Sequence, residues 1–168
     1  MATRGLVLLA KDTFSNVTSV SFDNVFSNTY KQYKLITVAS SSGPNNIRLR
    51  LRAGGSDNSS ANYARQYLVG TSTSVVAGRE TSQTSWNGVG RVENGIEMVS
   101  ICEILNPFQT AYTSASNLLI LNPTGSIEVL GLAYGITVTT SYDGFSLAPS
   151  DFSGTLFSGT VTLYGLAQ

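Results

Sequence analysis

The feature that most constrains this chain is the regular alternation of residues 157–165. Phe157, Val161 and Leu163 fall with two glycines on one side of an extended chain, whereas hydroxylated side chains fall on the other. A strand this regular near the end of a chain has to be hydrogen-bonded within a sheet, because unpaired ends are usually polar and frayed. The pattern therefore predicts a paired β-strand over residues 157–165.

Similar segments recur along the chain, separated by clusters of glycine, asparagine, proline and serine that favour turns. The expected strands are residues 5–10, 18–22, 32–39, 46–53, 96–105, 117–121, 126–136, 143–147 and 155–165. Residues 60–68 are the best helical candidate, with two turns at most, and 70–95 are expected to form a long excursion with short strands. These segments predict one all-β domain, 1–168: a two-sheet antiparallel sandwich with jelly-roll topology and less than about a tenth helix.

The low charge of the chain limits its possible partners. Charged residues make up 12% of the sequence and the net charge is zero, whereas soluble domains average about 25% charged residues. A phosphate-binding surface is therefore not indicated, and we expect no nucleic-acid partner. Uncharged hydroxyl groups are easier to bury than ions, so the composition is compatible with stable self-association and also with an ordinary neutral β-domain.

The chain contains no histidine, which excludes Ser-His-Asp and Cys-His catalysis and the common catalytic zinc sites. An enzyme would have to depend on carboxylates, but no two of the ten form a recognisable catalytic motif. Asp57-Asn58-Ser59 lacks the spacing of a calcium loop and is better explained as a solvated turn. We therefore expect a non-enzymatic protein with no metal and no cofactor.

Cysteine and apolar content indicate where the protein is made. Cys102 is the only cysteine, and its apolar neighbours predict a buried small residue, not a reactive thiol. No apolar stretch approaches the roughly 20 residues of a membrane span, and residues 5–10 are too short for a signal-peptide core followed by a cleavage site. The sequence thus predicts synthesis in the cytoplasm and no membrane partner.

The most distinctive local pattern is the alternation of arginine and aliphatic residues over 47–52. A period of two places Ile47, Leu49 and Leu51 on the core side and Arg48, Arg50 and Arg52 in a row outside. Like charges roughly 7 Å apart repel each other unless counter-charges are near. The row is therefore predicted either to meet carboxylates of a neighbouring subunit or an anionic ligand, or to be balanced by Glu97 or Glu103 within the same sheet.

Trp86 is the only tryptophan and lies in the segment 70–95. An exposed loop tryptophan would be a candidate binding anchor. The alternative is that its ring fixes a long loop to the core. The candidate intersubunit or docking residues are therefore Arg48, Arg50, Arg52, Trp86, Glu97 and Glu103.

Both ends of the chain resemble a jelly-roll domain of tailed-bacteriophage structural proteins. The first matching segment is 19–26, Ser-Val-Ser-Phe-Asp-Asn-Val-Phe, followed by Tyr-Lys-Gln-Tyr-Lys-Leu at 30–35. The strand 47–52 and the small-residue loop 54–60 continue the pattern, and Asp-Gly-Phe at 143–145 and Gly-Thr-Val-Thr-Leu-Tyr-Gly-Leu at 159–166 close it. Residues 70–125 depart from the family pattern.

This resemblance implies a non-enzymatic component of the virion that is a homo-oligomer, most often a trimer. The chain has no segment for a fibre shaft, so the expected role is a capsid decoration (cement) subunit that contacts the major capsid protein or other virion proteins. A short tail or tail-fibre component is the alternative, and a host-glycan-binding module is a further one. An exposed aromatic pair within residues 70–95 would favour the glycan-binding role.

Overall fold

The computed structural model describes residues 5–121, 127–150, 152 and 154–167. It is all-β, with 69% of residues in strands and no helix among the described residues. The two-sheet antiparallel sandwich predicted from the sequence is confirmed. The strands are β1 (Gly5–Val17), β2 (Val20–Phe22), β3 (Gln32–Ser41), β4 (Asn45–Ala53), β5 (Ser56–Asp57), β6 (Tyr63–Thr71), β7 (Ser74–Gln83), β8 (Trp86–Val92), β9 (Met98–Leu105), β10 (Ser114–Leu121), β11 (Glu128–Ile136), β12 (Gly144–Pro149) and β13 (Phe157–Ala167).

The larger sheet has eight strands in the order β1-β13-β3-β9-β10-β11-β6-β7. The smaller sheet has the order β2-β12-β4-β5, and β8 also pairs with β4. The named strand pairs are antiparallel in both sheets. The C-terminal strand β13 lies between β1 and β3, with Val161 opposite Asp12 on one side and Thr37 on the other. The paired strand predicted for residues 157–165 is therefore confirmed.

The core lies between the two sheets and follows the alternation of the strands. In β3 the odd-numbered positions from Tyr33 to Ala39 are buried, and in β13 Val161 and Leu163 are fully covered. In the smaller sheet, Leu49 of β4 lies opposite Leu147 of β12, and neither side chain is exposed. Side chains from the two sheets thus interdigitate as in other sandwiches.

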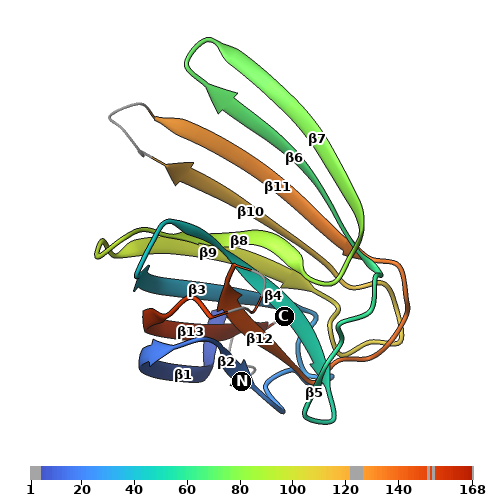
Figure 1. Ribbon diagram of the computed structural model, residues 1–168. Helices are drawn as coiled ribbons and strands as arrows, with labels where there is room; N and C mark the ends of the chain where they lie inside the picture. Colours follow the sequence, from blue (N-terminus) through green and yellow to red (C-terminus); the bar gives the residue numbers. More distant parts are fainter. Residues whose placement is uncertain (1–4, 122–126, 151, 153, 168) are drawn as a thin grey trace.

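Four strands of the larger sheet extend beyond the smaller sheet. The pairing of β9 with β10 covers only four residue pairs and ends where Asn117 lies opposite Cys102. Beyond this point β10, β11, β6 and β7 separate from the other strands and rise away from the sandwich (Figure 1). We call these four strands the wing.

Two sequence predictions for the middle of the chain are wrong. Residues 60–68 are not helical: Tyr63 begins strand β6, which pairs along its length with β11. The segment 70–95 holds the long strand β7 and the strand β8 instead of short strands in an excursion. Pairing overrode local preference in residues 63–71, because β6 is hydrogen-bonded on one side to its hairpin neighbour β7 and on the other side to the distant strand β11.

Most other expected strands are present with shifted ends. The first runs from Gly5 to Val17, well beyond the predicted residue 10, and the last begins at Phe157 instead of residue 155. The segment expected at 117–121 begins earlier, at Ser114. Residue 126, the expected first residue of the strand 126–136, lies outside the described residues.

Candidate docking surfaces

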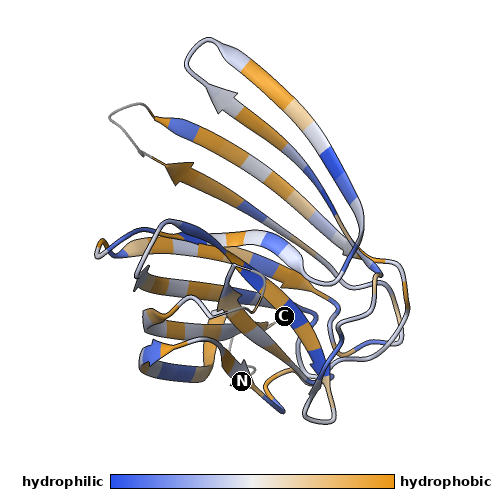
Figure 2. Cartoon of the chain, viewed as in Figure 1, coloured by the Kyte–Doolittle hydropathy of each residue, from blue (hydrophilic) through white to orange (hydrophobic). Residues whose placement is uncertain are grey.

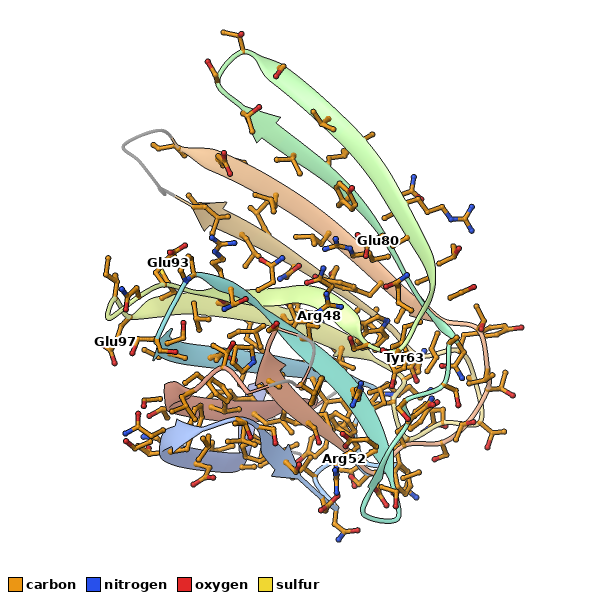
Figure 3. The ribbon with its side chains drawn as sticks, in the orientation of Figure 1. Arg48, Arg52, Tyr63, Glu80, Glu93 and Glu97 are labelled. Carbon is orange, nitrogen blue, oxygen red and sulfur yellow. The ribbon has the colours of Figure 1, made fainter. Side chains whose placement is uncertain are left out.

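The arginine row lies on the outer side of β4, as the alternation predicted. Ile47, Leu49 and Leu51 have no exposed surface, whereas the arginines between them are partly exposed. The predicted orientation of the row is therefore confirmed. Figure 3 shows Arg48 and Arg52 toward opposite ends of this strand.

Arg52 is held by a polar network within the chain. Its Nε lies 2.7 Å from Oδ1 of Asp23, and its Nη1 lies 2.5 Å from Oδ1 of Asp57. Nη1 also donates to the hydroxyl of Ser146 (3.0 Å), and that hydroxyl donates to Asp57 (2.7 Å). The hydrogen bond to Asp23 is the main reason why the pKa of Arg52 is raised. This guanidinium thus connects β4 with β5, β12 and the segment after β2.

The other two arginines have different surroundings. Arg50 donates from Nε to the carbonyl oxygen of Thr84 (3.1 Å), and its guanidinium carbon lies 4.1 Å from the centre of the Phe152 ring. This geometry is a cation–π contact. Arg48 is half-buried and lies opposite Ala148 of β12 and Asn87 of β8.

Glu97 and Glu103 do not balance the row within the same sheet, so that prediction is wrong. Glu103 lies on β9 of the larger sheet, opposite Lys34, and accepts a hydrogen bond from Nε2 of Gln32 (3.4 Å). Glu97 is exposed in the segment between β8 and β9, away from Arg52 (Figure 3). Asp23 and Asp57 are the counter-charges of Arg52, which sequence distance alone did not identify. Contact of the row, Glu97 or Glu103 with another subunit stays a prediction.

Trp86 is a core residue, which corrects its assignment as a possible docking anchor. Its side chain is 1% exposed and begins strand β8. The indole Nε1 donates to the carbonyl oxygen of Gly135 (3.0 Å), and the ring contacts Tyr63 and Tyr134. An aromatic ring buried in this way cannot contact a partner on the surface. Residues 70–95 therefore lack the exposed aromatic pair that would favour glycan binding.

Exposed aliphatic side chains lie on the outer face of the larger sheet, which points away from the smaller sheet. On β9, Val99 is 64% exposed, and Ile101 and Leu105 lie beside it in the same alternation. On β10, Leu118 and Ile120 continue this face. Further exposed aliphatic side chains on it are Leu6, Leu8, Leu68, Val75 and Val129. Figure 2 shows the corresponding apolar colouring of these strands.

The sequence contains a signal for this face. In β9 and β10 both alternate sets of positions carry apolar side chains, so Ile104 and Leu119 face the core while Ile101 and Ile120 face outward. A strand with one face in solvent normally alternates between apolar and polar residues. These two strands depart from that alternation at Val99, Ile101, Leu118 and Ile120, which are apolar and exposed.

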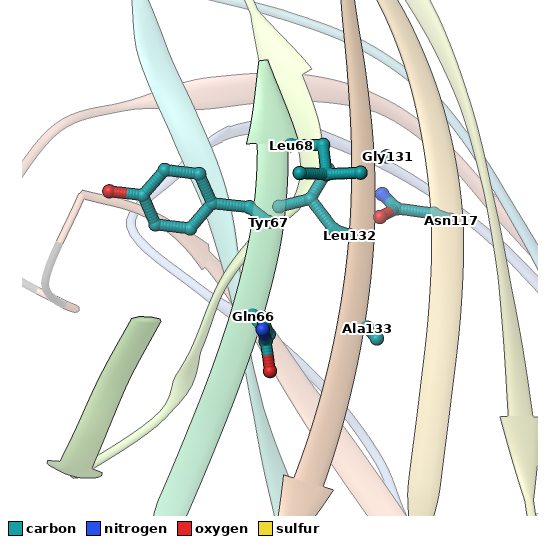
Figure 4. A pocket seen from close by; sticks show the side chains of 7 residues that line it. All are labelled: Gln66, Tyr67, Leu68, Asn117, Gly131, Leu132 and Ala133. Carbon is teal, nitrogen blue, oxygen red and sulfur yellow. The ribbon is translucent and has the colours of Figure 1, made fainter. Parts of the chain in front are cut away.

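Residues of β6, β10 and β11 line a pocket in the wing. A pocket of about 480 Å³ is lined by Gln66, Tyr67, Leu68, Asn117, Gly131, Leu132 and Ala133 (Figure 4). Four of these residues, Gln66, Leu68, Gly131 and Ala133, hold outward positions of β6 and β11. A Cβ atom placed at Gly131 would meet no atom within 4 Å. The pocket is thus open to a side chain from outside.

The thiol of Cys102 is buried. Burial raises the pKa of the Cys102 thiol to about 12, so the thiolate is suppressed at neutral pH. The residues that the structure describes contain no group of three or more candidate metal ligands. Nor do they form any helix of the length and apolarity that a membrane crossing requires.

A second, polar pocket of about 350 Å³ lies beside β5. It is lined by Ala53, Ser56, Asp57, Asn58, Ser60, Asn62, Val138, Thr140 and Tyr142. Asn58 donates from Nδ2 to the hydroxyl of Tyr142 (2.7 Å), whose ring is buried. The pocket therefore offers hydrogen-bonding groups without an exposed ring for stacking.

No protein-family model matches this chain, no curated protein matches it, and no solved structure matches its fold.

Proposed function

We propose that this protein is a non-enzymatic structural subunit of a bacteriophage virion that self-associates and stabilises the capsid shell. The sequence resemblance at 19–35 and 143–166 supplies the virion context. The observation that carries a mechanical role is the apolar outer face of the larger sheet. The subunit would function by covering this face with partner proteins.

The order of the strands supports the jelly-roll part of the proposal. Omitting the wing, the larger sheet reads β1-β13-β3-β9, and the smaller sheet reads β2-β12-β4-β8. Along the chain, strands β1 to β4 alternate between the two sheets, and so do β12 and β13. Two interleaved four-stranded sheets of this kind are the arrangement of a jelly roll. The wing hairpins β6–β7 and β10–β11 would then be insertions that extend one sheet.

The exposed apolar face supports docking. Monomeric proteins seldom expose contiguous apolar patches larger than a few hundred Å². Five aliphatic side chains are exposed on the outer face of β9 and β10: Val99, Ile101, Leu105, Leu118 and Ile120. Few charges interrupt this region, and the nearest are Lys34 and Glu103. This composition matches the centre of a protein–protein interface, where ions are depleted.

The distribution of carboxylates supports a role without catalysis. Asp23 and Asp57 pair with Arg52, Glu80 pairs with Arg65, and Glu93 pairs with Arg91. A catalytic carboxylate pair requires two acids that face each other across a substrate cleft. Carboxylates engaged in ion pairs stabilise the fold instead.

The location within the virion can be determined by quantitative mass spectrometry of purified particles. We expect a copy number comparable to that of the major capsid protein. A few copies that match the tail symmetry would move the protein to the short tail or tail fibre. Absence from particles would contradict the virion role, and binding to the polar pocket beside β5 in a glycan array would then favour the glycan-binding module.

Docking through the outer face can be tested with a charge substitution. Ile101→Asp places a carboxylate in the middle of the apolar face, and we expect at least a tenfold loss of binding to empty shells. Ser59→Asp introduces the same charge in the exposed loop after β5 and should leave binding unchanged. Equal binding of both variants would show that the outer face does not dock.

A further inference from the structure

The larger sheet is split between β9 and β10. The pairing of these two strands ends where Cys102 lies opposite Asn117. Both strands continue past this pair, β9 as residues 98–101 and β10 as residues 118–121. Figure 1 shows the two strands diverging there. We call the wedge between 98–101 and 118–121 the slot, with its closed end at the last pair.

Each wall of the slot is a strand with one unpaired edge. On the sides away from the slot, residues 98–101 pair with β3 and residues 118–121 pair with β11. Among the described residues, no backbone hydrogen bond is made on the sides that face each other. Unpaired peptide groups along a strand are a template for another chain. The slot therefore offers two such templates at once.

Aliphatic side chains border the slot on the outer face of the sheet. Val99 and Ile101 are exposed on one wall, and Leu118 and Ile120 are exposed on the other. The closed end opens into a pocket of about 460 Å³, which is lined by Lys34, Ile101, Glu103, Ser116, Asn117 and Leu118. A ligand that enters the slot from the outer face thus meets apolar surface on both sides.

Strand β8 of the smaller sheet closes the slot toward the core. A Cβ atom placed at Gly88 would lie 3.2 Å from a side-chain carbon of Leu132 in the wing, and one at Gly90 would lie 2.9 Å from the hydroxyl of Ser100 in β9. The inward side chains of Ser100 and Leu119 are both buried. The slot is therefore accessible only from the outer face and from its open end.

An extended polypeptide segment is the occupant that fits these features. Two rows of unpaired peptide groups recognise another backbone by strand addition. Since residues 98–101 and 118–121 contain no charged side chain, the middle of the segment should be aliphatic, with alternate side chains beside Val99 and Ile120. Four residues of extended chain span about 13 Å. A segment of four or five residues would thus occupy the length of the walls.

The open end of the slot is acidic. Glu97 directly precedes β9 and is exposed, and Glu128 lies opposite Leu121 at the start of β11. Within the part of the chain that the structure describes, neither carboxylate forms an ion pair. At the closed end, by contrast, Lys34 lies opposite Glu103, so the charges balance. The segment should therefore carry a lysine or arginine where it leaves the open end.

We infer that the slot binds an extended segment of a partner protein as an added β-strand between β9 and β10. The segment is aliphatic in its middle and basic at the open end. The inference deepens the proposed docking through the outer face, and it rests on that proposal for the identity of the partner as a shell protein. A flat contact between side chains, without an added strand, is the alternative that the experiment must separate.

A displayed library of random linear peptides of about 12 residues tests the slot without a known partner. Peptides selected on the natural chain are synthesised and their affinities measured. Val99→Asp and Leu118→Asp place a carboxylate on each wall and should weaken binding at least tenfold. Val75→Asp and Leu8→Asp are the matched controls, because both side chains are exposed on the two edge strands of the same sheet. Both controls should bind as the natural chain does, and unchanged fluorescence of Trp86 shows that each variant is folded.

Hydrogen exchange distinguishes an added strand from a flat contact. With peptide bound, we expect backbone amides in both 98–101 and 118–121 to exchange at least tenfold more slowly, while those of β1 and β7 exchange as before. A library that yields no binder would overturn the inference. Peptides that bind Val99→Asp and Leu118→Asp as tightly as the natural chain would also overturn it, and so would bound peptides that leave exchange in both walls unchanged.

Purified empty shells test the proposed function separately. We expect the selected peptides to compete with the shells for the protein. Shell binding that resists saturating peptide would contradict the slot as the docking site but keep the docking role. Peptide binding in the slot by a protein that neither binds shells nor occurs in virions would contradict only the proposed function.

Discussion

The hydroxyl of Tyr63 accepts a hydrogen bond from the backbone N–H of Leu51 at 2.9 Å. Tyr63 begins β6 at the base of the wing, whereas Leu51 lies in β4 of the smaller sheet. The same hydroxyl donates to the carbonyl oxygen of Asn58 (2.9 Å). One buried side chain thus fixes the root of the wing to the strand that carries the arginine row.

Tyr63→Phe therefore tests how much these hydrogen bonds between the base of the wing and β4 contribute to stability. The substitution keeps the ring but leaves the N–H of Leu51 without its acceptor in the core, so we expect a loss of about 1–3 kcal/mol of unfolding free energy. Tyr112→Phe removes a hydroxyl from a 65% exposed ring and should change stability by less than about 0.5 kcal/mol. Urea unfolding of both variants measures the difference, and equal stabilities would contradict the bridging role.

The network around Arg52 should contribute measurably to stability. Arg52→Gln removes the charge that pairs with Asp23 and Asp57. Both carboxylates keep partial access to water, so we expect a moderate loss of about 2 kcal/mol of unfolding free energy. Arg79→Gln, at an exposed position of β7, is the control and should stay within about 0.5 kcal/mol of the natural chain. A neutral effect of Arg52→Gln would mean that solvation replaces the network.

Because the thiol of Cys102 is buried, we expect the free energy of unfolding to fall at alkaline pH. Its pKa is about 12 in the folded chain and 9.0 as a free thiol, so unfolding at a pH between these values releases a proton. Because the pKa is raised in the folded chain, the contribution of the protonated thiol to the free energy of unfolding is complete below pH 9 and is lost as the pH rises toward 12. Between pH 8 and 10, the natural chain should lose about 1 kcal/mol more than Cys102→Ala.

The comparison with Cys102→Ala isolates the thiol, because the buried tyrosines titrate in both proteins. As an independent check, the thiol should resist a water-soluble disulfide reagent at pH 8 and react once the chain is unfolded in urea. Rapid reaction of the folded protein would show that Cys102 is accessible.

The close approach of two strands explains why the Asp-Gly-Phe motif at 143–145 has glycine at position 144. It begins β12, and a Cβ atom placed there would lie 2.0 Å from the backbone oxygen of Phe22 in β2. Gly144→Ala should therefore force β2 and β12 apart and lower the unfolding free energy by about 2 kcal/mol or more. Gly131→Ala, which meets no neighbour, should be close to neutral. Thermal unfolding of the two variants at matched concentration tests this difference.

Predictions based on local alternation agreed with the structure. The orientation of Arg48, Arg50 and Arg52 follows from the two-residue period of a strand, which fixes the side of each residue before any partner is known. The paired strand at the C-terminus follows for the same reason. Predictions that required distant partners did not agree: the counter-charges of Arg52 come from Asp23 and Asp57, and Trp86 meets Gly135 from 49 residues away.

The outer face of the larger sheet could have been predicted more sharply. Both faces of β9 and β10 carry aliphatic residues: Ile104 and Leu119 are buried, whereas Ile101 and Ile120 are exposed on the outer face. The sequence pattern therefore contained apolar residues on both faces of these strands. It did not show which of them stay exposed, because that depends on where the smaller sheet ends.

The sequence by itself determined the all-β class, the two faces of most strands and the absence of histidine chemistry, since each of these follows from residue types and a two-residue period. Only the tertiary structure decided the order of the strands, the burial of Trp86 and the existence of the wing. Strand β6 shows the reason: 60–68 has mixed local preference, and its place in the sheet is set by pairing with the hairpin neighbour β7 and with β11, far along the chain. Pairing between distant segments, and not local propensity, selects which surfaces remain exposed for partners.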